Sequence, residues 1–163
     1  MILEEKKGAE LCITRIFDVP KDKVFQAWTD ASYLKHWWAP KTCTLTYLKI
    51  DFKVGGTIHS CIKTPNGKEC WMKGVYQEII VPEKIVYTST IVDKNGNSVS
   101  PVDVGMDKDW PRETLITVHF DDMKSKTKIT LSQTVLESLA KRTGAYPSWV
   151  EMFDRLFDIL IKF

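Results

Sequence analysis

The chain has 163 residues, a length typical of one domain, so the sequence predicts a single domain over residues 1–163. Its net charge is only +2 with both signs interspersed, which argues against a nucleic-acid or anionic-membrane partner. The start, MILEEKKGAE, has charged residues where a secretory signal peptide needs an apolar run, and no window approaches 18 apolar residues, so we expect a cytoplasmic protein without a membrane span.

Alternating apolar and polar residues predict a strand at Glu10–Phe17. A helix opened by Pro20 then runs to Trp28, and a second short helix covers Ala31–His36. Further strands, separated by turns rich in glycine and proline, are predicted at Cys43–Phe52, Thr57–Lys63, Glu69–Val81, Lys84–Val92, Glu113–Asp121 and Thr127–Thr134. Consecutive hairpins favour an antiparallel sheet of about seven strands, and the fold class is α+β.

The end of the chain, from Leu136 to Phe163, has helical periodicity. Two apolar lines run along it, formed by Trp149, Met152, Phe153, Leu156, Leu160 and Phe163 and by Val150, Phe157 and Ile161. A helix that is apolar over more than half its circumference must be covered on two sides. We therefore expect a short turn before Gly144, a long helix after Ala145, and a curved sheet wrapped around that helix.

The space between sheet and helix is the candidate binding site. The residues predicted to line it are Trp38, Ile58, Ser60, Met72, Tyr76, Tyr87, Trp110, Ile116, Val118, Trp149, Met152 and Phe153. In the strand at residues 69–81, Val75, Gln77 and Ile79 are the alternative inward set to Met72 and Tyr76. For Trp28 a core position is favoured, whereas Trp38, Trp110 and Trp149 suit a packed core and an aromatic-lined pocket equally well. Loop residues 107–112 are placed to fold over the mouth of this space.

An empty apolar void of ~300 Å³, at the low end for ligand pockets, would cost on the order of 7 kcal/mol. The cavity must therefore be collapsed by large side chains, hydrated, or occupied by a ligand. The sequence offers bulky fillers together with the inward polar candidates Ser60, Gln133 and Tyr87, and it leaves these outcomes open.

Nothing in the sequence predicts catalytic residues, a metal site or a cofactor. Strand alternation points His59 and His119 outward, and His36 lies at a helix end, so none is placed as a general base. The four cysteines have no metal-ligand spacing and are expected to be reduced. A disulfide between Cys61 and Cys70 is the alternative.

The run TRIFDVPKDKVFQAWTDASYLKHWWAP, followed by FKVGG and KGVYQEIIVPEKIVYT, resembles the family named after the activator of the Hsp90 ATPase. The resemblance continues through DKNGN, DWPRETLITVHF and KTKITLSQT into the terminal helix. It implies the helix-grip fold of the START-like (SRPBCC) superfamily, which also holds polyketide cyclases and lipid-transfer domains. Ser148-Trp149 stands where members often carry Gly-Trp, and Val150 and Met152 replace commonly polar or small residues, so the resemblance implies a smaller or more apolar pocket.

Three functions follow from these patterns. The first is binding of an apolar or amphipathic small molecule, favoured by the doubly apolar helix and the lack of a catalytic constellation. The second, implied by the family name alone, is contact with an Hsp90-type chaperone. The third is a cyclase- or hydrolase-like enzyme acting in the cavity, since fold alone does not convey function. A monomer and a homodimer are both compatible with the sequence, and a dimer would use strand edges or the Trp37-Trp38 surface.

Overall fold

The computed structural model describes residues 8–162. Most of the charged start and Phe163 of the apolar stripe lie outside these residues. The strands are β1 (Glu10–Phe17), β2 (Thr44–Ile50), β3 (Thr57–Lys63), β4 (Glu69–Ile80), β5 (Lys84–Val92), β6 (Glu113–Met123) and β7 (Lys126–Leu136). The helices are α2 (Lys21–Thr29), α3 (Ala31–Leu34), α4 (Glu137–Thr143) and α5 (Ala145–Lys162), with the 3-10 turn η1 at Pro101–Val104.

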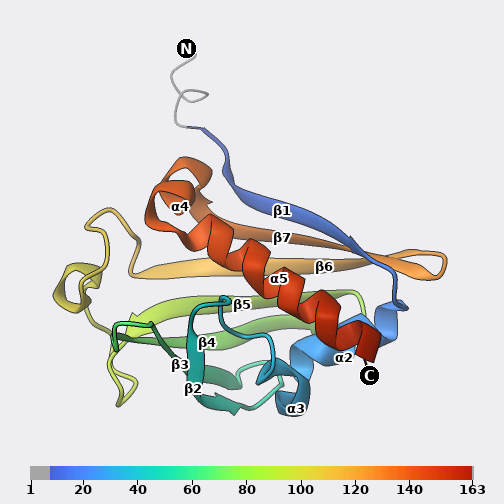
Figure 1. The fold of residues 1–163 in the computed structure, drawn as a ribbon, viewed down its shortest axis with the longest axis horizontal. Helices are drawn as coiled ribbons and strands as arrows, with labels where there is room; N and C mark the ends of the chain where they lie inside the picture. Colours follow the sequence, from blue (N-terminus) through green and yellow to red (C-terminus); the bar gives the residue numbers. More distant parts are fainter. Residues whose placement is uncertain (1–7, 163) are drawn as a thin grey trace.

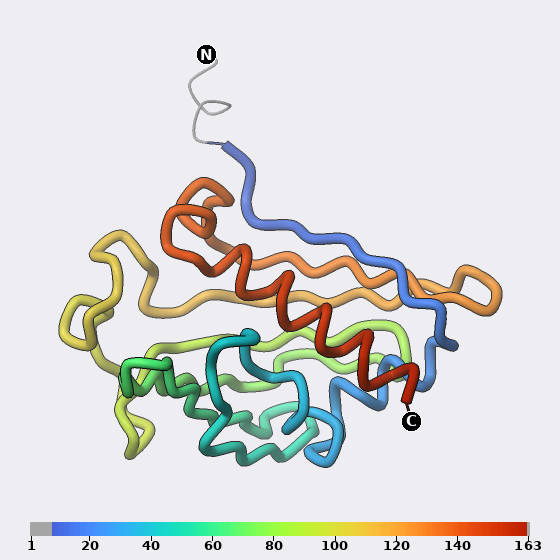
Figure 2. Tube along the Cα trace, viewed as in Figure 1, coloured from blue at the N-terminus to red at the C-terminus, as the bar shows by residue number. Residues whose placement is uncertain are grey.

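The strands form one antiparallel sheet in the order β1-β7-β6-β5-β4-β3-β2. Helix α5 lies diagonally across one face of this sheet, while α2 and α3 cover the same face beside the C-terminal half of α5 (Figure 1). The trace shows β1 running alongside β7 at one edge (Figure 2). The predicted α+β helix-grip fold is confirmed.

Turn chemistry sets the element boundaries. The β6–β7 hairpin is longer than predicted because its turn needs only Lys124 and Ser125, with Lys124 in the left-handed region at φ 66°. Strand β2 is shorter than predicted because the backbone N–H of Lys53 already bonds Asp51 in a turn. Helix α3 ends two residues before the predicted His36.

A glycine separates the two last helices. Gly144 has φ +91° and caps α4, so the chain leaves the helix at the one residue type that takes this conformation without steric cost. Helix α5 begins at the next residue. The break before the long helix is therefore where the sequence predicts it.

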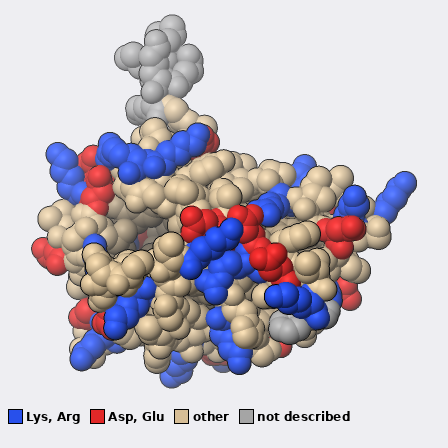
Figure 3. Space-filling model, viewed as in Figure 1, with Lys and Arg blue, Asp and Glu red and all other residues tan. Residues whose placement is uncertain are grey.

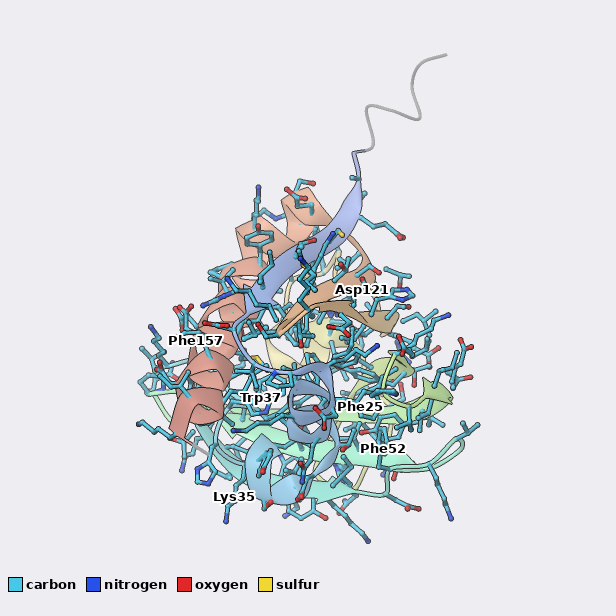
Figure 4. The ribbon with its side chains drawn as sticks, turned by 90° about the vertical axis from the view of Figure 1, so that its right-hand side faces the viewer. Phe25, Lys35, Trp37, Phe52, Asp121 and Phe157 are labelled. Carbon is cyan, nitrogen blue, oxygen red and sulfur yellow. The ribbon has the colours of Figure 1, made fainter. Side chains whose placement is uncertain are left out.

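Aromatic rings fill the end of the molecule beneath the C-terminal half of α5. Phe120 of β6 packs edge to face on Phe25 of α2, with ring centroids 5.1 Å apart, and Phe153 of α5 packs on Phe17 of β1 at 6.3 Å. In Figure 4, Trp37 and Phe25 lie to either side of the α2 ribbon. Trp28 is 3% exposed, so its predicted core position is confirmed.

Trp37 and Trp38 do not form an exposed pair. Trp37 is fully buried and its indole N–H donates to the Ala27 carbonyl over 3.0 Å, whereas Trp38 is half-buried. A dimer through this surface would need a different conformation, so self-association remains a prediction that rests on the strand edges.

The surface carries both signs of charge. On the face crossed by α5, acidic and basic side chains alternate without a large patch of one sign (Figure 3). Within residues 8–162, no helix combines the length and apolar character needed to cross a membrane.

Candidate functional site

An inner cavity of about 170 Å³ lies between the N-terminal half of α5 and the concave face of the sheet. Eight predicted residues line it: Trp38, Ser60, Met72, Tyr87, Trp110, Ile116, Trp149 and Met152. The other lining residues are Ile62, Ser89, Gln133, Ala145 and Ser148. Ser89 was missed although it follows Tyr87 by two positions, the spacing that keeps side chains on one face of a strand.

Four predicted residues do not line this cavity. Ile58 borders a neighbouring niche instead. Tyr76 is buried against Phe52, with ring centroids 5.0 Å apart, away from α5. Val118 and Phe153 are fully buried in the aromatic core beneath the other half of the helix. Strand alternation indicates which side chains point to the buried face of the sheet. It does not indicate which of these side chains lie beside the cavity.

A buried amide organises one wall of the inner cavity. The side-chain oxygen of Gln133 accepts a hydrogen bond from the indole N–H of Trp149 over 3.1 Å. Its side-chain nitrogen donates to the Thr114 hydroxyl over 3.0 Å. Because Gln133 bonds at both ends, it fixes Trp149 of α5 to strands β6 and β7, and its polar atoms are satisfied within the protein.

Replacing Gln133 by leucine should therefore leave the Trp149 indole N–H without its partner inside the protein. We expect a loss of about 2 kcal/mol of unfolding free energy, within the cost of an unsatisfied buried donor. Urea denaturation followed by tryptophan fluorescence measures it. Gln77→Leu is the matched control, because Gln77 is exposed and bonds only its neighbour's carbonyl at 3.4 Å. Equal losses in the two variants would contradict the role assigned to Gln133.

Tyr87 contributes a buried hydroxyl group to the set of residues that line the cavity. Its side chain is 4% exposed, and its buried hydroxyl has no hydrogen-bond partner among the described residues. Burial raises the pKa of Tyr87 well above its ordinary value, with the neighbouring Tyr76 adding to the effect, so the hydroxyl stays protonated. A protonated hydroxyl can donate one hydrogen bond and accept others.

A niche of about 30 Å³ adjoins the inner cavity at Tyr87, Ser60 and Ser89. Gly74 lines this niche, and a Cβ there would lie 2.1 Å from the Thr88 carbonyl oxygen, so the position admits no side chain. Here the Val75 N–H bonds the Thr88 hydroxyl at 3.0 Å. The niche has room for one water-sized group.

The loop between β5 and β6 contributes one residue to the cavity wall. It places Trp110, 7% exposed, in the cavity wall, as the sequence predicts. Arg142 of α4 bonds Asp107 and Asp109 at 3.2 and 3.1 Å. The Asp109 backbone N–H, followed by the Arg142 guanidinium, lowers the pKa of Asp107. These contacts hold the loop against the helical side of the cavity.

The cavity wall suits binding better than acid–base chemistry. Its lining residues are apolar, hydroxyl-bearing or amide side chains, and Tyr87 is the titratable one. His59 lies on the opposite face of the sheet, where its ring packs on Tyr47 and Trp71 at 5.3 and 5.4 Å. Burial there lowers the pKa of His59. The described residues hold no cluster of three or more His, Cys, Asp or Glu side chains placed to share a metal ion.

The cysteines are free thiols. In the β3–β4 ladder Cys61 lies opposite Trp71, whereas Cys70 lies opposite Ile62. Successive ladder positions point to opposite faces of the sheet, so the two thiols are directed apart. The alternative Cys61–Cys70 disulfide is therefore wrong for this structure.

Residues 18–160 match the family described as Activator of Hsp90 ATPase homolog 1-like protein. No curated protein matches the chain. A Staphylococcus epidermidis protein solved by NMR is 23% identical, with 95% of this chain and 91% of that one covered and a TM-score of 0.77.

Two crystal structures are also similar. One is of a Nitrosomonas europaea protein, 18% identical, with 94% of each chain covered and a TM-score of 0.74. The other is of the AHSA1 protein of Silicibacter pomeroyi, 16% identical, with 94% of this chain and 98% of that one covered and a TM-score of 0.72. At these identities the similarity shows a shared fold.

Proposed function

The chain belongs to the family of activator of Hsp90 ATPase homolog 1-like proteins, and from this premise and the inner cavity we propose that it binds a small, largely apolar molecule carrying one polar group. The observation that carries the proposal is Tyr87: its side chain lines the inner cavity, and its buried hydroxyl has no hydrogen-bond partner among the described residues. A buried hydroxyl without a hydrogen bond is costly, and a ligand oxygen or nitrogen beside it would remove that cost.

The volume of the cavity supports a ligand of limited size. An apolar cavity of roughly 150 Å³ accommodates a benzene ring, so a monocyclic molecule suits this one.

Phenol and toluene are the probes, because they differ mainly in the group that would face Tyr87. We expect phenol to bind the wild-type protein more tightly than toluene in calorimetric titrations. Tyr87→Phe should weaken phenol binding about 5- to 10-fold, equivalent to about 1 kcal/mol for one hydrogen bond, and leave toluene binding unchanged. The same substitution should not lower protein stability, because the hydroxyl has no partner within the described residues.

Tyr76→Phe is the matched control. Tyr76 is buried on the same face and lies opposite Tyr87 in the β4–β5 ladder, but it does not line the inner cavity. It should change neither titration. Equal phenol affinity in wild type and Tyr87→Phe would show that the hydroxyl is satisfied otherwise, for example by a water in the adjoining niche. Failure of both probes to bind would refute the binding function.

Contact with an Hsp90-type chaperone stays a prediction from the family's description, since no contact or charge pattern of the described residues favours it. A cyclase- or hydrolase-like activity also stays a prediction. An enzymatic role would need a titratable group that exchanges a proton with the bound molecule. Burial keeps Tyr87 protonated, so its hydroxyl is suited to donating a hydrogen bond instead. Binding is therefore the function the geometry supports best.

A further inference from the structure

A second space, the outer pocket, lies beyond the inner cavity at the end of the sheet. Its volume is about 270 Å³, larger than that of the inner cavity. The start of β4, the end of β5 and the loop after η1 enclose it, and its apolar wall consists of Cys70, Trp71, Met72, Ile91, Val92, Val104 and Met106. Glu69, Asp93 and Lys94 border its rim.

Met72 lines both spaces, and its partner across the β4–β5 ladder is Ile91, which lines the outer pocket. The Met72 side chain is only partly buried, so it is not locked by packing on all sides. Methionine is unbranched with three rotatable bonds and repacks at low cost. A change of Met72 rotamer is therefore one small movement that would connect the two spaces.

Neither space alone matches a usual ligand site. Pockets that bury drug-sized ligands run from about 300 to 1,000 Å³. The inner cavity and the outer pocket each fall below that range, whereas joined through Met72 they lie within it. The polar groups of the two spaces also differ in kind, because the inner cavity is lined by the uncharged Tyr87, Ser60 and Gln133, whereas the charged residues Glu69, Asp93 and Lys94 line the outer pocket.

We infer that the two spaces form one bipartite site for an elongated amphipathic molecule. This inference rests on the proposed function and specifies its ligand class. A ring with a hydroxyl or carbonyl group occupies the inner cavity beside Tyr87. A flexible apolar tail passes Met72 into the outer pocket, and its far end lies near the charged rim. Met72 thereby determines how long a tail the protein accepts.

Phenols with 4-ethyl, 4-butyl and 4-hexyl tails test the inference by calorimetric titration. Each CH₂ that leaves water for the outer pocket should raise affinity about fourfold, from ~0.8 kcal/mol per buried CH₂. Affinity should therefore keep rising through the hexyl compound. A site limited to the inner cavity has room for about one ring, and its affinity should fall beyond the ethyl compound.

Two variants locate the tail. Met72→Ile conserves volume but is stiff at χ1, so it should abolish most of the gain in affinity from butyl and hexyl tails, measured as the ratio of hexylphenol to phenol affinity in the same variant. Met106→Ala changes the outer pocket without touching the inner cavity, and it should weaken only the long-tailed phenols. Met123→Ala is the control, since Met123 is 44% exposed on the β6–β7 hairpin and should change no titration.

Thiol alkylation supplies a readout at the pocket itself. Cys70 lines the outer pocket, whereas Cys12 is exposed on β1. Hexylphenol should slow the alkylation of Cys70 by iodoacetamide and leave that of Cys12 unchanged, and phenol should slow neither. Phenol binding without a gain from the tail, or with unprotected Cys70, overturns the bipartite site and leaves the proposed function standing. Failure of phenol and toluene to bind overturns the proposed function itself.

Discussion

Replacing Phe153 by alanine is expected to remove about 3–5 kcal/mol of unfolding free energy, the range for truncating a buried aromatic side chain. Phe153 is fully buried in the middle of α5, and its ring contacts those of Phe17, Trp28 and Trp149 at centroid distances of 6.3, 6.2 and 5.9 Å. The substitution removes contacts that join the helix to β1, α2 and its own preceding turn. A typical domain has only about 5–15 kcal/mol in total, so the variant should be only marginally folded.

Phe157→Ala is the control for this prediction. Phe157 lies one turn further along α5, is half-buried, and contacts Phe17 at a less close 6.5 Å. Its truncation should cost about 1–2 kcal/mol, in keeping with partial burial. Urea denaturation followed by far-UV circular dichroism measures both variants. A loss at Phe153 no larger than that at Phe157 would show that α5 is not held chiefly by its buried stripe.

The substitution Gly74→Ala should cost about 3 kcal/mol, at the upper end for overpacking. The new Cβ would meet the Thr88 carbonyl oxygen at 2.1 Å and the Ile58 side chain at 3.3 Å. The first of these is a backbone atom, so β4 and β5 must separate to admit the methyl group. For a protein of this size we expect a fall in melting temperature of roughly 6–12 °C.

Gly67→Ala distinguishes this clash from a general effect of losing a glycine. Gly67 has φ +88° and an added Cβ would meet nothing within 4 Å, so only the left-handed conformation is penalised, by about 1 kcal/mol. Phenol affinity provides a second readout. Gly74 and Tyr87 line the same niche, so Gly74→Ala should also weaken phenol binding, whereas Gly67→Ala should not. Comparable melting temperatures in the two variants would contradict the predicted clash.

Most of the fold follows from local sequence patterns. Strands β3 and β5 have the predicted bounds because alternating side chains end at clear turn residues. The break at Gly144 follows from its conformational freedom, and the gripped helix follows from its two apolar lines. The turn η1 was not predicted, because four residues within a polar loop leave no periodic signal.

The candidate site was predictable in part. Alternation placed Ser60 and Tyr87 on the concave face, where they line the cavity, whereas in β4 it left open whether Met72 or Val75 points inward. It does not separate them from Val118, which shares that face but lies under the packed half of α5. Whether a residue of the concave face lines the inner cavity depends on where α5 crosses the sheet. That crossing depends on tertiary packing, which local sequence patterns do not encode. The outer pocket likewise requires a loop and two strand ends to meet in space, so no local pattern indicates it.

The pairing of β1 with β7 has a consequence during protein synthesis. Leu11 lies opposite Gln133 in the β1–β7 ladder, so about 120 residues are synthesised between these two ladder partners. At roughly 5–20 residues per second, β1 waits on the order of 6–24 seconds on the ribosome. Throughout that interval Leu11, Ile13 and Phe17, all buried in the folded protein, are exposed on the nascent chain. The N-terminal strand is thus the segment that most needs shielding while the chain is being translated.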